Sequence, residues 1–165
     1  MGIGEVMRGH TVGRVLASKS PSVKPGDFVT AIGGWQEYAV VDANSIEVPP
    51  PGFDQSRLTD LLSVQGMTSL TAYFGLLKIG DPKAGETVVV SGAAGATGSV
   101  VGQIAKIKGA RVIGIAGSDE KVNYITKELG FDVGLNYKAP DFKEKFLEAT
   151  KDHIDVYFDN GKLSN

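Results

Sequence analysis

The sequence predicts an α/β protein in which part of a doubly wound parallel sheet follows a shorter β-rich segment. Segments typical of strands and helices alternate from residue 87 to residue 158, and a glycine-rich loop at 91–98 joins the first strand to its helix. Three prolines at 49–51 separate this series from short strand-like runs before them. Alternation of buried strands with helices is typical of parallel sheets with right-handed crossovers.

The composition excludes several classes of function. Of the 165 residues, 42% are hydrophobic and 22% are charged, with a formal net charge of −2, which gives no basis for binding nucleic acid or an anionic membrane. No apolar run approaches the ~20 residues that cross a bilayer, so we expect a cytoplasmic protein. Cysteine is absent, and the only histidines are His10 and His153, which we expect to be structural or at the surface. We therefore predict no disulfide and no metal site.

The N-terminal part, residues 1–55, is predicted to be a β-rich domain. Pro25 and Gly26 mark a tight turn, because proline fixes its φ angle and glycine accepts a positive one. The expected strands occupy residues 12–17, 28–32 and 37–41. The proline run can neither continue a sheet nor lie within a helix, so we expect a second domain of residues 56–165 to follow it.

The second predicted domain alternates strands with amphipathic helices. The expected helices occupy residues 66–79, 99–108, 118–129 and 141–150. The expected strands occupy residues 87–90, 111–116, 132–135 and 154–158. Ser118 is the expected N-cap of the third helix, and Gly130 is expected to end it.

The glycine-rich loop carries the strongest local signal. Gly95 and Gly98 have the spacing of the last two glycines in the G-x-G-x-x-G dinucleotide fingerprint, and Ala93 stands in place of the first. A small residue at Gly95 lets the backbone approach a pyrophosphate, and Gly98 lets the helix pack on the strand. The N–H groups at the start of the helix would then face the phosphates. A glycine-rich turn without a ligand is the alternative, and a phosphate-loop NTPase is disfavoured because no Gly-Lys-Ser/Thr follows.

The end of the second strand indicates which dinucleotide would bind. NAD-dependent proteins usually carry an acidic residue there, about 20 residues beyond the loop, which binds the ribose 2′-hydroxyl. Here the strand ends without a carboxylate at Ala116 and Gly117, which leaves room for a 2′-phosphate. Ser118 could donate a hydrogen bond to that phosphate, and Lys121 could supply a positive charge. The alternative for Lys121 is an ordinary solvated helix lysine.

Several sequence blocks carry a family resemblance. They lie at residues 34–40, 66–76, 91–98, 98–106, 117–121 and 157–160. These blocks resemble zinc-independent medium-chain dehydrogenase/reductases, and among them the NADPH-dependent alkenal and one double-bond reductases, a branch that includes prostaglandin and curcumin reductases. The resemblance covers nearly the whole chain. It implies a partial Rossmann domain preceded by part of a GroES-like β-barrel domain.

The resemblance also implies NADPH as the cofactor and the residues that contact it. In the family, the positions that match Lys121 and Tyr137 contact the 2′-phosphate and its surroundings. The position that matches Asn160 contacts the cofactor near the ribose or the nicotinamide, and Met67 and Thr71 match the helix that lines the nicotinamide pocket. The backbone that cradles the pyrophosphate matches Gly95, Ala96, Thr97 and Gly98. Tyr137 could otherwise be an ordinary half-buried aromatic residue, and Asn160 a simple turn residue.

The reaction implied by the resemblance is hydride transfer from NADPH to the β-carbon of an α,β-unsaturated ketone or aldehyde. The carbonyl oxygen becomes an enolate, which hydrogen-bond donors must stabilise. No metal is required, and a homodimer is usual in the family. Two alternatives remain open: an NADPH quinone reductase, and a non-catalytic fragment that binds nucleotide. No catalytic residue is assigned.

Family members are about twice as long as this chain, so we expect both domains to be partial. The strand at 154–158 would then lie at an open edge of the sheet, with Ile154, Val156 and Phe158 exposed. We do not expect intact activity from the chain alone, and the strands that usually form the dimer are expected to be missing.

Overall fold

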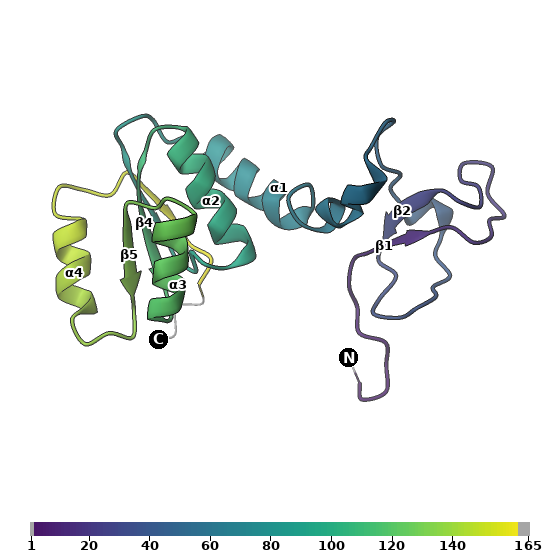
Figure 1. Ribbon diagram of the computed structural model, residues 1–165, viewed down its shortest axis with the longest axis horizontal. Helices are drawn as coiled ribbons and strands as arrows, with labels where there is room; N and C mark the ends of the chain where they lie inside the picture. The colour runs from purple at the N-terminus through teal and green to yellow at the C-terminus, as the bar shows by residue number, and fades with distance from the viewer. Residues whose placement is uncertain (1, 162–165) are drawn as a thin grey trace. The chain divides into compact units, whose positions relative to one another are not determined.

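The computed structural model describes residues 2–161 in two compact units, Met1–Gly66 and Met67–Asn165 (Figure 1). Residues 1 and 162–165, at the outer ends of the two predicted domains, lie outside the described residues. The division falls later than the boundary predicted at residue 55. The reason is that the helix η2 (Gln55–Leu62) packs with β1 (Thr11–Arg14) of the first unit.

The first unit is built around one antiparallel strand pair, β1 with β2 (Phe28–Ala31). The predicted turn before β2 is confirmed, because Gly26 has a φ of +99° and the Asp27 N–H donates to the Lys24 carbonyl. A short helix, η1 (Ala43–Ser45), follows. The strand predicted at 37–41 is wrong, since no described segment pairs with its backbone and Val40 is fully exposed. β-prone residues alone do not make a strand without a partner.

The second unit contains a parallel four-stranded sheet. Its strands are β3 (Thr87–Val90), β4 (Arg111–Ala116), β5 (Val133–Asn136) and β6 (Val156–Phe158). Their order across the sheet is β5-β4-β3-β6, which is the order 3-2-1-4 of a doubly wound sheet. The predicted fold class is confirmed. The order reverses between β3 and β6, and ligands of such sheets bind at that switch point.

The helices of the second unit follow the predicted pattern, with bounds that differ by up to three residues. They are α1 (Met67–Phe74) continuing as η3 (Gly75–Gly80), α2 (Ala96–Ile107), α3 (Asp119–Asn123) continuing as η4 (Tyr124–Glu128), and α4 (Phe142–Ala149). The predicted cap of α3 is confirmed, because the Ser118 hydroxyl accepts from the Lys121 N–H at 3.3 Å. Gly130, with a φ of +73°, follows η4 as predicted.

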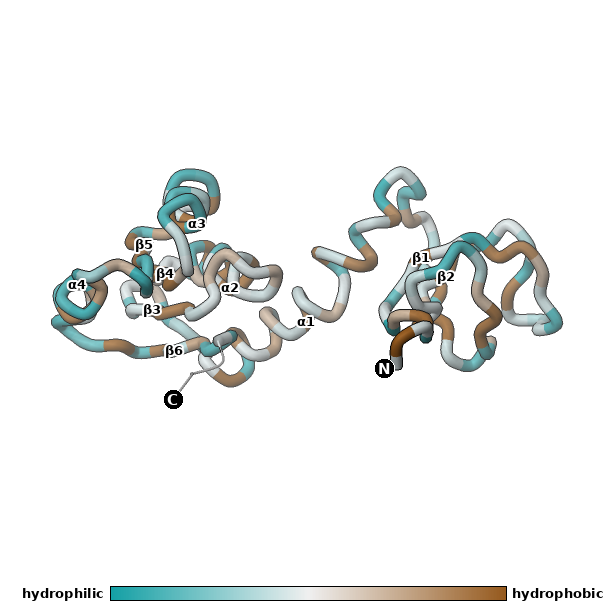
Figure 2. Tube along the Cα trace, turned by 90° about the horizontal axis from the view of Figure 1, so that it is seen from below, coloured by the Kyte–Doolittle hydropathy of each residue, from teal (hydrophilic) through white to brown (hydrophobic). Residues whose placement is uncertain are grey.

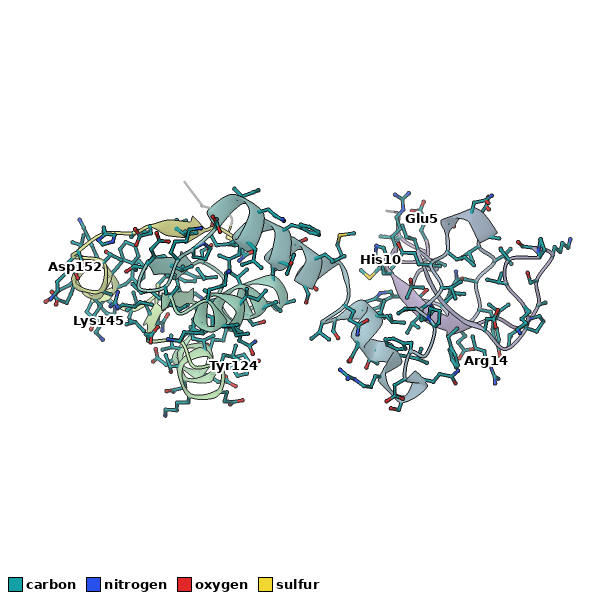
Figure 3. The ribbon with its side chains drawn as sticks, turned by 90° about the horizontal axis from the view of Figure 1, so that it is seen from above. Glu5, His10, Arg14, Tyr124, Lys145 and Asp152 are labelled. Atoms are coloured by element: carbon teal, nitrogen blue, oxygen red, sulfur yellow. The ribbon has the colours of Figure 1, made fainter. Side chains whose placement is uncertain are left out.

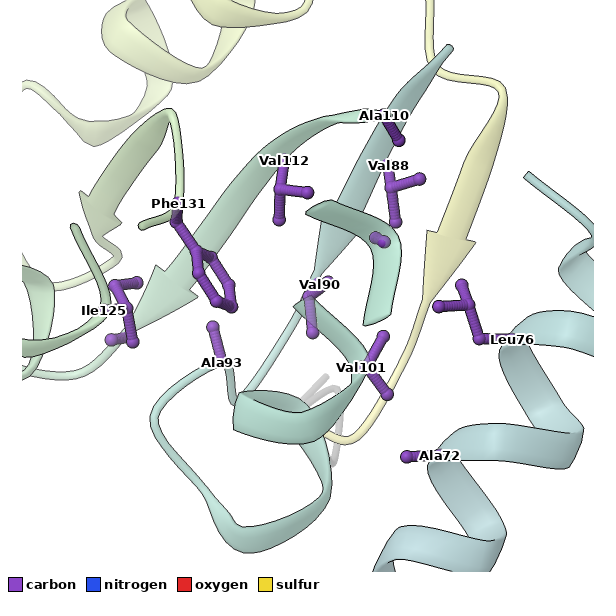
Figure 4. Close-up of a cluster of buried hydrophobic side chains, with 12 residues drawn as sticks. Ala72, Leu76, Val88, Val90, Ala93, Val101, Ala110, Val112, Ile125 and Phe131 are labelled. Atoms are coloured by element: carbon purple, nitrogen blue, oxygen red, sulfur yellow. The ribbon is translucent and has the colours of Figure 1, made fainter. Parts of the chain in front are cut away.

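Apolar side chains pack on both faces of this sheet. Along β3, Val88 and Val90 point to one face and Val89 to the other, as strand geometry requires. The larger cluster lies under α1, α2 and η4, where the Phe131 ring packs beside Ala93 (Figure 4). Figure 2 shows hydrophobic residues along strands of this sheet, whereas α3, which lies outside the sheet, is mostly hydrophilic. The other face is covered by α4, whose residues pack against Val89, Ile113, Ile115 and Leu135.

Among the described residues β6 is the last strand of the sheet, as predicted, and Ile154 just before it is 38% exposed. The predicted exposure of Val156 and Phe158 is wrong. Val156 and Phe158 are partly buried, because they pack against the cluster that includes Leu76 of η3. The helix comes this close because it carries a glycine there: a Cβ at Gly75 would lie 2.8 Å from the Phe158 ring. The largest exposed apolar side chain of β6 is Tyr157, at 47%.

Asp132 ties α2 to the start of β4 and should make stability depend on pH. Its carboxylate accepts from Lys106 at 2.7 Å and from the Val112 N–H at 2.6 Å. Burial would raise the pKa of Asp132, but these contacts outweigh it and hold the pKa below the usual value. A lowered folded-state pKa stabilises the fold above the unfolded pKa of about 3.9, and that stabilisation is lost as pH falls through the folded value.

We therefore expect Asp132→Asn to flatten the dependence of stability on pH. Wild type should lose more unfolding free energy than the variant between pH 6 and pH 3, by under about 1 kcal/mol because the ion pair is partly exposed. Urea midpoints at the two pH values measure this difference. Parallel losses in both proteins would contradict the role of Asp132.

Candidate functional site

A pocket of about 510 Å³ lies at the carboxyl ends of the parallel strands. Its lining comes from the loop after β3 and the first turn of α2, the end of β4, the start of α3, the turn after β5 and the segment after β6. The lining residues are Gly92, Ala94, Gly95, Ala96, Thr97, Gly98, Ile115, Ala116, Gly117, Lys121, Tyr137, Lys138 and Asn160. This is the side of a doubly wound sheet where ligands bind.

The glycine-rich loop brings the start of α2 to the pocket. Gly95 is the N-cap residue of α2, and its own N–H donates to the Gly92 carbonyl at 2.9 Å. The helix passes so close to this loop that a Cβ on Gly98 would lie 2.4 Å from the Gly92 oxygen. The helix begins at Ala96, three residues before the predicted start. Ala96 and Thr97 are therefore first-turn residues, and so is Gly98.

The first turn of α2 offers free donors to an anion. The N–H groups of Ala96, Thr97 and Gly98 have no hydrogen-bond acceptor among the described residues. Unsatisfied N–H groups at a helix start attract phosphate, because the helix dipole adds to their partial positive charge. This part of the pocket fits a pyrophosphate.

Positive charge gathers at the end of the pocket beside β4 and β5. Lys121 and Lys138 both line it, and the Lys138 ammonium lies 5.7 Å from the centre of the Tyr137 ring. Tyr137 packs over Gly117, where a Cβ would lie 3.1 Å from its ring. No carboxylate lines the pocket among the described residues. The lysines of the ion pairs in this part of the chain lie elsewhere, at 83, 106, 145 and 151.

Asn160 is fixed at the switch point by Ser91. Its backbone N–H donates to the Ser91 hydroxyl oxygen at 2.8 Å, and its side-chain amide donates to the Ser91 carbonyl at 3.2 Å. The same hydroxyl donates to Asp159, and that contact, with a Gly161 N–H bond, lowers the pKa of the Asp159 carboxyl. Burial and the nearby Asp159 raise the pKa of Tyr157. Ser91 thus holds the segment after β6 against β3.

The structure gathers most of the residues predicted from the sequence, but not all. Seven of the ten predicted cofactor residues line the pocket: Gly95, Ala96, Thr97, Gly98, Lys121, Tyr137 and Asn160. Ser118 stands beside it and caps α3. Met67 and Thr71 do not line it: Met67 is 65% exposed, and the Thr71 hydroxyl donates to the Met67 carbonyl at 2.8 Å.

Two polar residues that matter to this site were not predicted from the sequence: Lys138, which lines the pocket, and Ser91, which holds Asn160. Ser91 is buried directly after the apolar strand β3, so a polar residue ending an apolar run was the available signal. Lys138 adjoins Tyr137 in sequence, and nothing in the sequence alone distinguishes it from a solvated lysine.

A second hollow of about 690 Å³ adjoins the outer face of α3 and η4. It shares Ala94 and Lys121 with the first pocket, and its other lining includes Glu120 and Glu128. Figure 3 labels Tyr124, the first residue of η4 and another residue that lines this hollow. Its two carboxylates make this hollow less suited to phosphate than the 510 Å³ pocket, which the first turn of α2 lines.

Two family profiles match the chain. A profile described as the N-terminal domain of oxidoreductase matches residues 1–48, and one described as zinc-binding dehydrogenase matches residues 96–162. Mouse (Mus musculus) prostaglandin reductase 1 is 50% identical over 166 residues, which cover 98% of this chain and 50% of that protein. The NADPH-dependent curcumin reductase of Escherichia coli is 45% identical over 158 residues, which cover 96% of this chain and 45% of that protein.

Solved structures agree with the sequence matches. CurA from Vibrio vulnificus is 47% identical and superposes with a TM-score of 0.90, over 98% of this chain and 48% of CurA. The chain belongs to the medium-chain dehydrogenase/reductase family. A second CurA structure, in complex with NADPH, superposes on this family member with a TM-score of 0.89. The resemblance stated from the sequence is confirmed, as is the pairing of a Rossmann-type sheet with part of a GroES-like domain.

This medium-chain dehydrogenase/reductase chain spans about half the length of the curated relatives it matches. One matching profile is named for zinc. Among residues 2–161, however, no group of three or more His, Cys, Asp or Glu side chains is placed to hold a metal ion. In the same range, no helix is both long and apolar enough to cross a membrane.

Proposed function

We propose that this chain forms the NADPH-binding part of a reductase that reduces the C=C bond of α,β-unsaturated ketones and aldehydes. The observation that carries the proposal is the pocket. Unsatisfied N–H groups of a helix start and two lysines line it, and among residues 2–161 no carboxylate does. Mouse prostaglandin reductase 1 and the E. coli NADPH-dependent curcumin reductase support it by their names, and CurA by its complex with NADPH.

The residues present fit the cofactor along the length of the pocket. The first turn of α2, with Gly95 before it, would hold the pyrophosphate. Lys121 and Tyr137 would hold the 2′-phosphate, since charge-assisted hydrogen bonds are the stronger kind. Asn160, held by Ser91, would contact the ribose or the nicotinamide side.

NADPH supplies the hydride when it is bound, and the chain's own residues bind and orient it. The developing enolate oxygen needs hydrogen-bond donors, and the α-carbon needs a proton. Met67 and Thr71 stay predicted residues of the nicotinamide pocket. We also propose, from the family, zinc-independent chemistry, a cytoplasmic location and a homodimeric full-length protein.

NADPH should stabilise the purified chain against heat, and NADH should do so far less. Ligand at 100 times its Kd adds about 2.7 kcal/mol, which raises Tm by roughly 5–10 °C in a protein of this size. Thermal unfolding with each nucleotide at equal concentration measures the effect. No shift with either nucleotide would contradict the proposal.

Turnover separates the proposed reaction from its alternatives. NADPH oxidation is followed by absorbance with a medium-chain enone and, in parallel, with p-benzoquinone, both with EDTA present. Faster oxidation with the enone supports the proposed reductase, and faster oxidation with the quinone supports a quinone reductase. NADPH binding without either reaction would assign this chain nucleotide binding alone.

A further inference from the structure

We propose that Asn136 and Asp119 form a bridge that sets the preference of the pocket for NADPH over NADH. This inference rests on the proposed binding of NADPH. Asn136 is the last residue of β5, and Asp119 is the first residue of α3. The Asn136 amide nitrogen donates to the Asp119 carboxylate at 2.7 Å.

The other end of the Asn136 amide reaches the second lysine of the pocket. Its oxygen accepts from the backbone N–H of Lys138 at 3.0 Å. The side chain therefore connects the segment that carries Lys121 with the turn that carries Tyr137 and Lys138. All three of these residues line the pocket, whereas Asp119 and Asn136 do not. The bridge therefore positions the three side chains that would bind a 2′-phosphate.

The bridge also holds the Asp119 carboxylate in a hydrogen bond. Without that bond, the negative charge of the carboxylate would repel a 2′-phosphate. In NAD-binding proteins an acidic residue near the end of this strand binds the ribose 2′-hydroxyl. Asp119 is the first acidic residue after β4. Its carboxylate is hydrogen-bonded to Asn136 and lies outside the pocket lining. Releasing this carboxylate would place a negative charge close to the proposed phosphate and disfavour NADPH.

The orientation of the amide makes the bridge specific to asparagine. Turning the amide over would set its oxygen against the Asp119 carboxylate and its nitrogen against the Lys138 N–H. An aspartate at position 136 has nearly the same shape and can still accept from Lys138. It would repel Asp119, because two carboxylates cannot share a hydrogen bond unless one of them takes up a proton.

A double-mutant cycle tests the bridge. Kd values for NADPH and NADH are measured for wild type, Asn136→Asp, Asp119→Asn and the double variant, and also for Asn136→Ala, which removes the amide. We expect Asn136→Asp to weaken NADPH binding by about tenfold or more while NADH changes little, since adjacent like charges discriminate between ligands that differ in charge. Asp119→Asn keeps an acceptor for the Asn136 amide and should bind NADPH at least as well as wild type.

The double variant decides between a bridge and simple added charge. Its net charge equals that of wild type, and its hydrogen bond would run in the reverse direction, from the amide introduced on α3 to the carboxylate introduced at the end of β5. We expect most of the NADPH affinity to return. Affinity that stays as low as in Asn136→Asp would overturn the proposal, and so would an unchanged NADPH to NADH ratio in Asn136→Ala.

The nucleotide preference of wild type and the hydrogen exchange of Lys138 separate failure of the bridge from failure of the proposed function and from misfolding of a variant. A wild-type chain without preference for NADPH would overturn the proposed function together with the bridge. A wild-type preference that all variants retain would overturn the bridge alone. Hydrogen exchange of the Lys138 amide, measured without nucleotide, should speed up in Asn136→Ala but not in Asn136→Asp. Equal exchange in the two variants would contradict the contact.

Discussion

Lys121→Ala should weaken NADPH binding by roughly 10- to 100-fold and leave NADH binding nearly unchanged. A hydrogen bond to a charged group contributes about 1.5–3 kcal/mol, and each 1.4 kcal/mol is about a factor of ten in affinity. Lys121 lines the pocket, and no carboxylate among the described residues lines it to compensate the charge. NADH lacks the 2′-phosphate, so it has nothing for this ammonium group to bind. Titration calorimetry with both nucleotides measures the change.

Lys127→Ala is the matched control for that experiment. Lys127 lies on η4, the continuation of the same helix, and lines the neighbouring hollow but not the pocket. Removing it changes the net charge by the same amount, and we expect less than about a twofold loss because salt screens distant exposed charges. Equal losses in the two variants would show that NADPH responds to overall charge and not to a contact with Lys121.

Gly98→Ala should both destabilise the second unit and abolish measurable nucleotide binding. The added Cβ would lie 2.4 Å from the Gly92 oxygen and 2.9 Å from the Ala93 Cα, and both of these are backbone atoms. Backbone cannot move aside as a side chain can, so the loop must separate from α2. Forced overpacking costs about 1–3 kcal/mol, and the shift misplaces the helix N–H groups. Urea unfolding and NADPH titration measure the two effects.

Ser99→Ala is the control in the same helical turn. Ser99 does not line the pocket, and its hydroxyl donates to the Ala96 carbonyl at 3.2 Å. We expect its stability to stay within about 0.5 kcal/mol of wild type and NADPH affinity to be kept. Wild-type stability and binding in Gly98→Ala would show that the loop does not need this close approach.

The sequence predicted the sheet well because its signals are local and strong. The run at β3 is buried along its whole length, and such continuous apolar runs are typical of parallel strands. Ser118 and Gly130 marked the helix ends, since capping depends on a few adjacent residues. The prediction of a strand at 37–41 was wrong because a strand needs a pairing partner that is distant in the sequence. Local composition carries no information about that partner.

Parts of the candidate site could be predicted where a single residue type has a specific chemical role, such as a lysine that can bind a phosphate. Lys121 and Tyr137 approach the same pocket because parallel strands end at one edge of the sheet. Lys138 and the bridge from Asn136 to Asp119 were missed, because they depend on how the turn after β5 meets the start of α3. Met67 and Thr71 do not line the pocket, and their place in a nicotinamide pocket stays a prediction.

The central claim is that the pocket at the carboxyl ends of the strands binds a 2′-phosphate. Calorimetric titration of this chain with adenosine 2′,5′-bisphosphate and with 5′-AMP tests it most directly, because the two ligands differ only in that phosphate. We expect the bisphosphate to bind at least about tenfold more tightly, and most of the difference to disappear in Lys121→Ala. Equal affinity for the two ligands in wild type would contradict the claim.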